Sequence, residues 1–91
     1  MEYRLKNHME DIVAKAVDQY MPQTDMCHCI KCRMDVMALA LNRLSPVYVV
    51  TDMGNLFASI DSTYVQNQVN AEIAVLKAIE LVKNSPKHAK S

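Results

Sequence analysis

Apolar residues recur along the first part of the chain at spacings of three and four, which is the period of one face of an α-helix. Over residues 2–20 they predict an amphipathic helix with these apolar positions: Leu5, Met9, Ile12, Val13, Ala16, Val17 and Tyr20. Asn7 and Glu10 fall on the opposite side, where we expect solvent. Pro22 ends this helix, because a proline disfavours helical geometry in the residue before it.

The same period resumes after a short polar loop and predicts a second helix over residues 30–44. Its apolar positions cover most of its circumference: Met34, Val36, Met37, Ala38, Leu39, Ala40, Leu41 and Leu44. Such a helix is typically buried at the centre of a fold. Pro46 follows its end.

Residues 45–55 form the least helical stretch, with several β-branched residues before Gly54. We expect an extended turn there, then a short helix over residues 53–59 capped by Thr51 or Asp52. A last helix follows a cap at Asp61 or Ser62. Its apolar stripe ends shortly before Pro86 and comprises Val65, Val69, Ile73, Leu76, Ile79 and Val82. The pattern thus predicts one all-α domain of three or four helices.

The amino-acid composition indicates that the chain associates with a second subunit. Of the 91 residues 51% are apolar, with seven Met, one Phe and no Trp. A Met-rich, aromatic-poor set packs adaptably but specifies a unique core poorly. Domains of this size often need a metal or a second subunit for stability. We therefore expect a homodimer that covers the surplus of apolar side chains.

Charge narrows the possible partners and the compartment. Ten basic and ten acidic residues give no net charge, so direct nucleic-acid binding, which needs a basic face, is not expected. No apolar run approaches the roughly 20 residues of a membrane span. The segment MEYRLKNHMEDIVAKAV contains acids and has no apolar core typical of a signal peptide. We expect a cytoplasmic protein with reduced thiols.

All three cysteines lie in one polar segment, at Cys27, Cys29 and Cys32. On a turn that leads into a helix, three sulfurs at this spacing can converge on one Zn²⁺ ion, which prefers four donors in a tetrahedron. The start of the second helix also favours thiolate at Cys32. The alternatives are three unrelated reduced cysteines, an iron–sulfur site, or a redox-sensitive thiol pair.

A fourth donor is needed, and the residues alone leave several candidates. His28 is nearest, but a residue between two ligands usually points outwards. His88 lies in the tail after the last helix, where a metal could fix the chain end. His8 on the first helix is expected to face solvent, and Asp25 offers an oxygen.

The string DMCHCIKCRMDVMALALNRLSPVYVVTD, preceded by Gln19-Tyr20-Met21, resembles the late competence protein ComFB family. The resemblance rests on the three cysteines and on Asp35, Val36, Ala38, Leu39, Leu41, Asn42, Ser45, Pro46 and Tyr48. It implies one all-α domain over residues 1–91 with a tail at 85–91, a homodimer and a structural zinc. Family members can carry a fourth cysteine after a Ser-Pro near the C-terminus. Here Ser85-Pro86 precedes His88, so the resemblance implies His88 as the fourth ligand.

ComFB-like proteins also look like receptors for cyclic dinucleotides such as cyclic di-GMP. The turn after the second helix offers an amide, a guanidinium, two hydroxyls, an aromatic ring and a carboxylate for such a ligand: Asn42, Arg43, Ser45, Tyr48, Thr51 and Asp52. A simpler interpretation is that Arg43 and Pro46 only end the helix, and that Tyr48 packs.

The sequence shows no paired catalytic carboxylates, no nucleophile beside a base and no Gly-rich phosphate loop, so we expect no enzyme. The leading hypothesis is a dimeric signalling or adaptor module that holds zinc and binds a cyclic dinucleotide. One alternative is a zinc-stabilised protein-interaction module linked to competence, without a small ligand. Another is a thiol redox sensor that loses zinc on oxidation.

Overall fold

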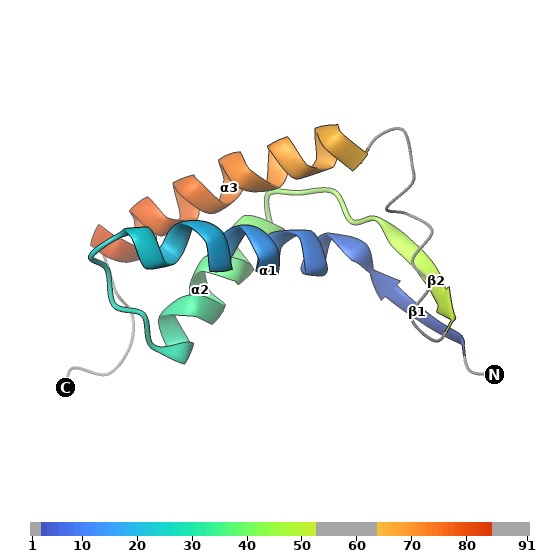
Figure 1. Cartoon of the computed structure of the whole chain (residues 1–91), viewed down its shortest axis with the longest axis horizontal. Helices are drawn as coiled ribbons and strands as arrows, with labels where there is room; N and C mark the ends of the chain where they lie inside the picture. The colour runs from blue at the N-terminus through green and yellow to red at the C-terminus, as the bar shows by residue number, and fades with distance from the viewer. Residues whose placement is uncertain (1–2, 53–63, 85–91) are drawn as a thin grey trace.

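The computed structural model describes residues 3–52 and 64–84, which form three α-helices and a two-stranded sheet (Figure 1). Their order is β1 (Tyr3–Asn7), α1 (His8–Tyr20), the 3-10 turn η1 (Met21–Gln23), α2 (Ile30–Leu41), β2 (Tyr48–Asp52) and α3 (Tyr64–Asn84). Helices α1 and α3 lie side by side and run in the same direction, and α2 runs back against both. The sheet extends from the end of the bundle at which α1 begins.

The core lies where the three helices face one another. It consists of Met9, Ile12, Val13, Ala16, Val17, Met21, Met26, Cys32, Val36, Ala40, Ala71, Ala74, Val75, Ala78, Ile79 and Val82. The helical periods predicted for the first and last segments correspond to α1 and α3. The buried face of α3 differs from the predicted stripe, because Val65, Val69, Ile73 and Leu76 are exposed. Smaller residues beside that stripe face α1 and α2 instead. Alanines on the buried face of α3 leave room for the helices to approach closely.

Strand β1 corrects the prediction of a helix that starts at residue 2. Residues 3–7 form β1, which pairs antiparallel with β2, and Leu5 lies opposite Val50 and is 73% exposed. Asn7 then caps α1, because its Oδ1 accepts the backbone N–H groups of Met9 (3.1 Å) and Val47 (2.9 Å). A cap at residue 7 places the start of the helix at His8.

His8 is a second correction, since it is only 5% exposed rather than solvent-facing. Its backbone N–H donates to the carbonyl oxygen of Val47 (2.7 Å), which brings the chain before β2 over the start of α1. Neither ring nitrogen has a hydrogen-bond partner, and Nδ1 lies 3.7 Å from Oδ2 of Asp11. Sequence periodicity could not show this, because Val47, which accepts the hydrogen bond from His8, lies far away along the chain.

Helix α2 ends at Leu41, three residues before the predicted end. The backbone then tightens, as the N–H groups of Arg43 and Leu44 bond to carbonyls three residues earlier, at 3.1 Å each. The helix is also buried on one side only. Cys32, Val36 and Ala40 are fully buried, whereas Ile30 and Met34 are 77% and 61% exposed.

The segment expected to be an extended turn contains strand β2, so the all-α prediction becomes a mostly helical fold with a small sheet. Its β-branched residues suit a strand. The predicted short helix over residues 53–59, the caps at Asp61 and Ser62, and the tail with His88 lie outside the described residues. Within the described ranges, no helix combines the length and apolar character needed to cross a membrane.

Candidate functional site

The loop that carries the cysteines is fixed at both of its ends. After η1, the side chain of Thr24 donates to the carbonyl oxygen of Met21 (2.8 Å), and the side chain of Met26 is buried in the core. At the other end Cys29 is the N-cap of α2, and its sulfur accepts the backbone N–H of Cys32 at 3.4 Å. The path of the loop is therefore set by helix packing and by capping.

The sulfur atoms of Cys27, Cys29 and Cys32 all lie within 4.8 Å of one another. Four sulfurs arranged tetrahedrally around zinc at 2.3 Å would be about 3.8 Å apart, so small side-chain rotations bring this triad to that geometry. Cys32 is buried, whereas Cys27 and Cys29 are exposed. The triad thus has an inner wall within the protein and an open outer side.

The cysteines differ in how readily they ionise in the metal-free protein. The N–H of Cys32, helped by the thiol of Cys27, lowers the pKa of Cys29 to about 7, so its thiolate is available near neutral pH. Burial raises the pKa of Cys32 to about 12, because a buried thiolate loses its hydration. A bound cation would offset that loss and hold Cys32 as a thiolate ligand.

The basic residues around Cys32 are committed to other groups. Lys31 Nζ pairs with Asp35 Oδ2 at 2.7 Å, and Arg33 Nη2 pairs with Asp18 Oδ1 at 3.0 Å. They therefore do not serve as direct partners of the sulfurs. A metal ion suits a site of this kind, because soft thiolates select cations such as zinc.

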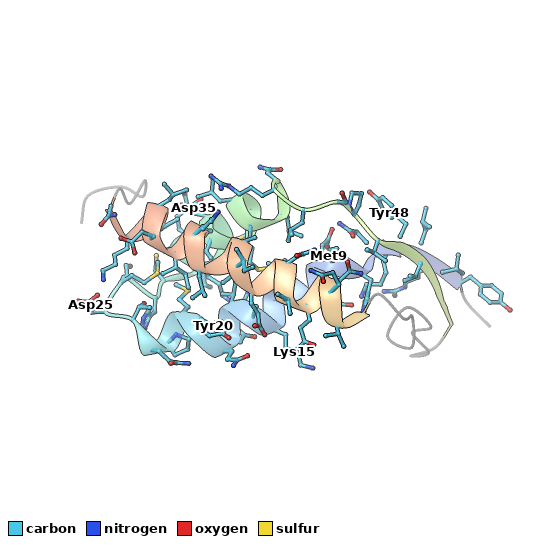
Figure 2. All side chains as sticks on the ribbon, turned by 90° about the horizontal axis from the view of Figure 1, so that it is seen from above. Met9, Lys15, Tyr20, Asp25, Asp35 and Tyr48 are labelled. Carbon is cyan, nitrogen blue, oxygen red and sulfur yellow. The ribbon has the colours of Figure 1, made fainter. Side chains whose placement is uncertain are left out.

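The other candidate donors lie apart from the triad or outside the described residues. His28 Nε2 lies 3.1 Å from the carbonyl oxygen of Thr24, and the His28 side chain is exposed. Asp25 pairs with Lys83 Nζ at 3.2 Å, an interaction that lowers the pKa of Asp25. This pair also brings the last turn of α3 alongside the cysteine loop, at the end of the molecule opposite Tyr48 (Figure 2).

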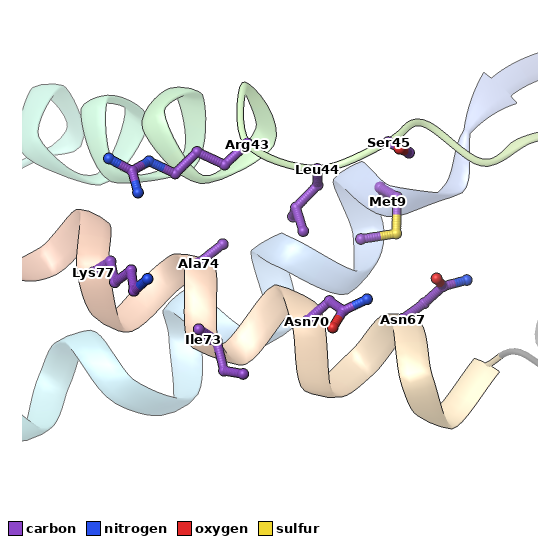
Figure 3. Close-up of a pocket in the computed structure, with 9 residues that line it drawn as sticks. All are labelled: Met9, Arg43, Leu44, Ser45, Asn67, Asn70, Ile73, Ala74 and Lys77. Carbon is purple, nitrogen blue, oxygen red and sulfur yellow. The ribbon is translucent and has the colours of Figure 1, made fainter.

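A second feature is a cavity of about 560 Å³ between the end of α2 and the side of α3 (Figure 3). Arg43, Leu44 and Ser45 form one wall. The other wall is a face of α3, with Met9 of α1 between them; it consists of Asn67, Asn70, Ile73, Ala74 and Lys77. The cavity is thus lined by three segments that are distant in sequence.

Two of the predicted ligand residues, Arg43 and Ser45, line this cavity. Asn42 is the C-cap of α2 and is not among the lining residues. Tyr48 lies on β2, 64% exposed, outside the lining as well. Of Thr51 and Asp52 the structure describes only the backbone, paired with β1. Of the six residues predicted to bind a ligand, the structure therefore brings two to the cavity.

The α3 wall contributes polar residues that sequence reasoning missed: Asn67, Asn70 and Lys77. Together with Ala74 they follow spacings of three, four and three, so they share one helical face. That spacing was visible in the sequence. What the sequence lacked was evidence that this face lies opposite the turn after α2.

Together these features define a class of small, mostly helical domain with a cysteine triad at the start of its second helix. The chain belongs to the ComFB family, since the family model described as "Late competence development protein ComFB" matches residues 6–86. It is similar to competence protein ComFB of Bacillus subtilis (strain 168), with 39% identity over 75 residues, or 81% of this chain and 74% of that protein.

The fold of this chain is also found in a solved structure. It matches that of the late competence protein ComFB from Bacillus subtilis with a TM-score of 0.72 and 33% identity. The match covers 92% of this chain and 96% of that chain. The sequence comparisons and the structural comparison therefore indicate the same family.

Proposed function

We propose that this chain is a cytoplasmic, non-enzymatic binding module of the ComFB type that holds one zinc ion through Cys27, Cys29 and Cys32. The convergence of the three sulfurs within 4.8 Å carries this proposal. Three cysteines and one histidine are a common ligand set for structural zinc. In a domain of 91 residues, the free energy of metal binding is also a part of the free energy of folding.

His88 is the fourth ligand that we propose. The Lys83–Asp25 ion pair supports it, because it brings the end of α3 beside the cysteine loop. His88 lies four positions after Asn84, and such a segment can extend to about 13 Å. We infer that this length lets the tail approach the metal from the open side of the triad.

Zinc content by elemental analysis tests both parts. We expect about one zinc per chain in the purified protein, and a lower melting temperature after chelation. His88→Ala should reduce zinc retention in a chelator competition, whereas the control His28→Ala should not, because the His28 ring lies against the Thr24 carbonyl. Protein purified without zinc would refute the metal, and a larger effect of His28→Ala would refute the fourth ligand.

We further propose that two chains associate through α3. Large apolar side chains are exposed along one side of this helix at spacings of four, four and three: Val65, Val69, Ile73 and Leu76. A second copy that covers this stripe would form an interface of about 1,600 Å² in total. Light scattering at micromolar concentration should give the mass of a dimer, and Val69→Glu should give that of a monomer.

A second candidate function is that of a cyclic dinucleotide receptor, and the position of Arg43 and Ser45 on one cavity supports it. Its volume of about 560 Å³ falls in the range of small-molecule sites. A guanidinium can bind a phosphate through two parallel hydrogen bonds or stack on a base. The resemblance to ComFB supplies the ligand class.

Calorimetry with cyclic di-GMP and cyclic di-AMP tests this function. A lost hydrogen bond to a charged group costs roughly 1.5–3 kcal/mol, so Arg43→Ala should weaken binding about ten- to a hundredfold. Helicity and zinc content should not change, because Arg43 is an exposed residue beyond the end of α2. If the wild-type protein binds neither compound at tens of micromolar, a zinc-stabilised protein-interaction module takes the place of the receptor.

A further inference from the structure

Two basic side chains without an ion pair border the cavity. Four cations of the described residues form ion pairs with carboxylates: Lys6, Lys31, Arg33 and Lys83. The other four described cations, Arg4, Lys15, Arg43 and Lys77, form none within the described ranges, and of these Arg43 and Lys77 line the cavity. Two uncompensated cations therefore border one space in a chain whose net charge is zero.

Among the described residues that line the cavity there is neither Asp nor Glu. The remaining polar groups of this described lining are the side chains of Ser45, Asn67 and Asn70. Each of these can donate a hydrogen bond to an anion or to a base edge. A cavity with two cations and no acid attracts negatively charged ligands.

The two cations come from opposite walls. Arg43 lies in the turn after α2 and Lys77 on α3, and Figure 3 shows Arg43 on the α2 side and Lys77 on the α3 side of the cavity that both residues line. Asn70 and Asn67 follow Lys77 along the same face of α3, towards Ser45 and Met9. A ligand that contacts both walls would therefore bridge two helices rather than rest on one turn.

We propose that Lys77 is a phosphate-binding residue that acts together with Arg43, and that Asn67 and Asn70 hydrogen-bond the base or sugar of the same ligand. This inference rests on the proposed cyclic dinucleotide function and names the second half of its site. A cyclic dinucleotide carries two phosphodiester groups with one negative charge each, which two cations match. Charge-assisted hydrogen bonds of this kind are about twice as strong as neutral ones.

The experiment is calorimetry of the full zinc-loaded chain with cyclic di-GMP, comparing three variants. Lys77→Met removes the charge but keeps the length of the side chain, and should weaken binding about ten- to a hundredfold. Lys77→Arg keeps the charge and should bind within about threefold of wild type. Lys15→Met is the matched control, since Lys15 is exposed on α1, away from the cavity, and has no ion pair within the described residues (Figure 2).

Salt provides a readout that a structural role of Lys77 would not change. Salt screens contacts between charges. The affinity of the wild type should therefore fall when the sodium chloride concentration is raised about tenfold. Lys77→Met should flatten this dependence, and Lys15→Met should not. Unchanged helicity and zinc content would show that the fold is retained.

The outcomes separate the two proposals. If the wild type binds and Lys77→Met binds like Lys15→Met, the role of Lys77 is overturned while the receptor function stands. If Lys77→Met loses binding and Lys77→Arg restores it, the two-walled site is supported. If Lys77→Arg binds as poorly as Lys77→Met, charge is not the reason and the inference fails. Absence of wild-type binding removes the receptor function and this inference with it.

Discussion

The cysteine triad and the cavity differ in how far apart along the chain their residues lie. The triad takes its three sulfurs from six consecutive positions, in the loop before α2 and in the first turn of that helix. The cavity takes its lining from α1, from the turn after α2 and from α3. The triad needs only the loop, the cap at Cys29 and the burial of Cys32, whereas the cavity exists only where the end of α2 packs on α3. Disturbances of the packing between the end of α2 and α3 should therefore change the cavity more than the cysteines.

The two sites also differ in the chemical type of ligand that their side chains suit. The triad offers soft thiols, one of them fully buried, and suits a cation that becomes a part of the structure. The cavity offers cations and amides on exposed side chains, and suits an anion that binds and leaves. Under the proposed functions, the cysteine triad would contribute stability and the cavity would serve reversible binding.

The largest expected effect is the loss of the buried ligand. Cys32→Ala should abolish stoichiometric zinc binding and lower the stability of the zinc-loaded protein by several kcal/mol, because structural zinc contributes directly to folding. Elemental analysis and thermal unfolding measure both quantities. Cys27→Ala is the control at an exposed position and should cost less stability. If Cys32→Ala and the zinc-loaded wild type are equally stable, the triad does not stabilise the fold through zinc.

A substitution at the cavity should show the converse. Ala74 is 5% exposed on α3, where α3 faces the end of α2. Ala74→Leu inserts a larger side chain there and should cost about 1–3 kcal/mol. Zinc content should stay at the wild-type level, since the cysteine loop is at the end of the bundle. Loss of zinc in this variant, measured by elemental analysis, would show that the two sites are not independent.

The cysteines of the triad should differ in their reactivity as thiols. In metal-free protein the pKa of Cys29 is about 7, so its thiolate fraction should rise from about one tenth at pH 6 to about nine tenths at pH 8. Alkylation of Cys29 should accelerate accordingly, while buried Cys32, with its pKa raised to about 12, stays unmodified. Peptide mapping by mass spectrometry follows each site, and bound zinc should protect both.

The smallest effect is expected where α3 meets the cysteine loop. Lys83→Ala removes the ion pair with Asp25, an exposed interaction, and exposed pairs contribute little to stability. The wild-type pair lowers the pKa of Asp25, so its small stabilisation is present at neutral pH and is lost as pH falls through that pKa. The melting temperatures of the two proteins should therefore converge in acid.

The parts of the molecule that were predictable from sequence are those set by short-range order. The helical period identified α1 and α3, and the spacing of Cys27, Cys29 and Cys32 placed the triad on a turn that leads into a helix, as observed. These features depend on residues within a few turns of one another. Local patterns were sufficient to find them.

The parts that were missed depend on contacts between distant segments. Strand β1 was read as helix because its partner lies 40 or more positions away, as in the pairing of Leu5 with Val50. His8 was expected to be exposed for the same reason. The sequence named Arg43 but not Lys77 as a candidate, because only the packing of α2 on α3 brings the two residues to one cavity. No period in the sequence records such an encounter.

Asn7 has a consequence for the order in which the protein assembles during synthesis. Its Oδ1 accepts one N–H from Met9, two positions on, and another from Val47, 40 positions on. At about 5–20 residues per second, the second donor leaves the ribosome roughly 2–8 seconds after the first. A helix of 13 residues is marginal in isolation. The nascent chain therefore has an early cap for α1 but no sheet, and the arrival of residue 47 locks the N-terminal strand in register.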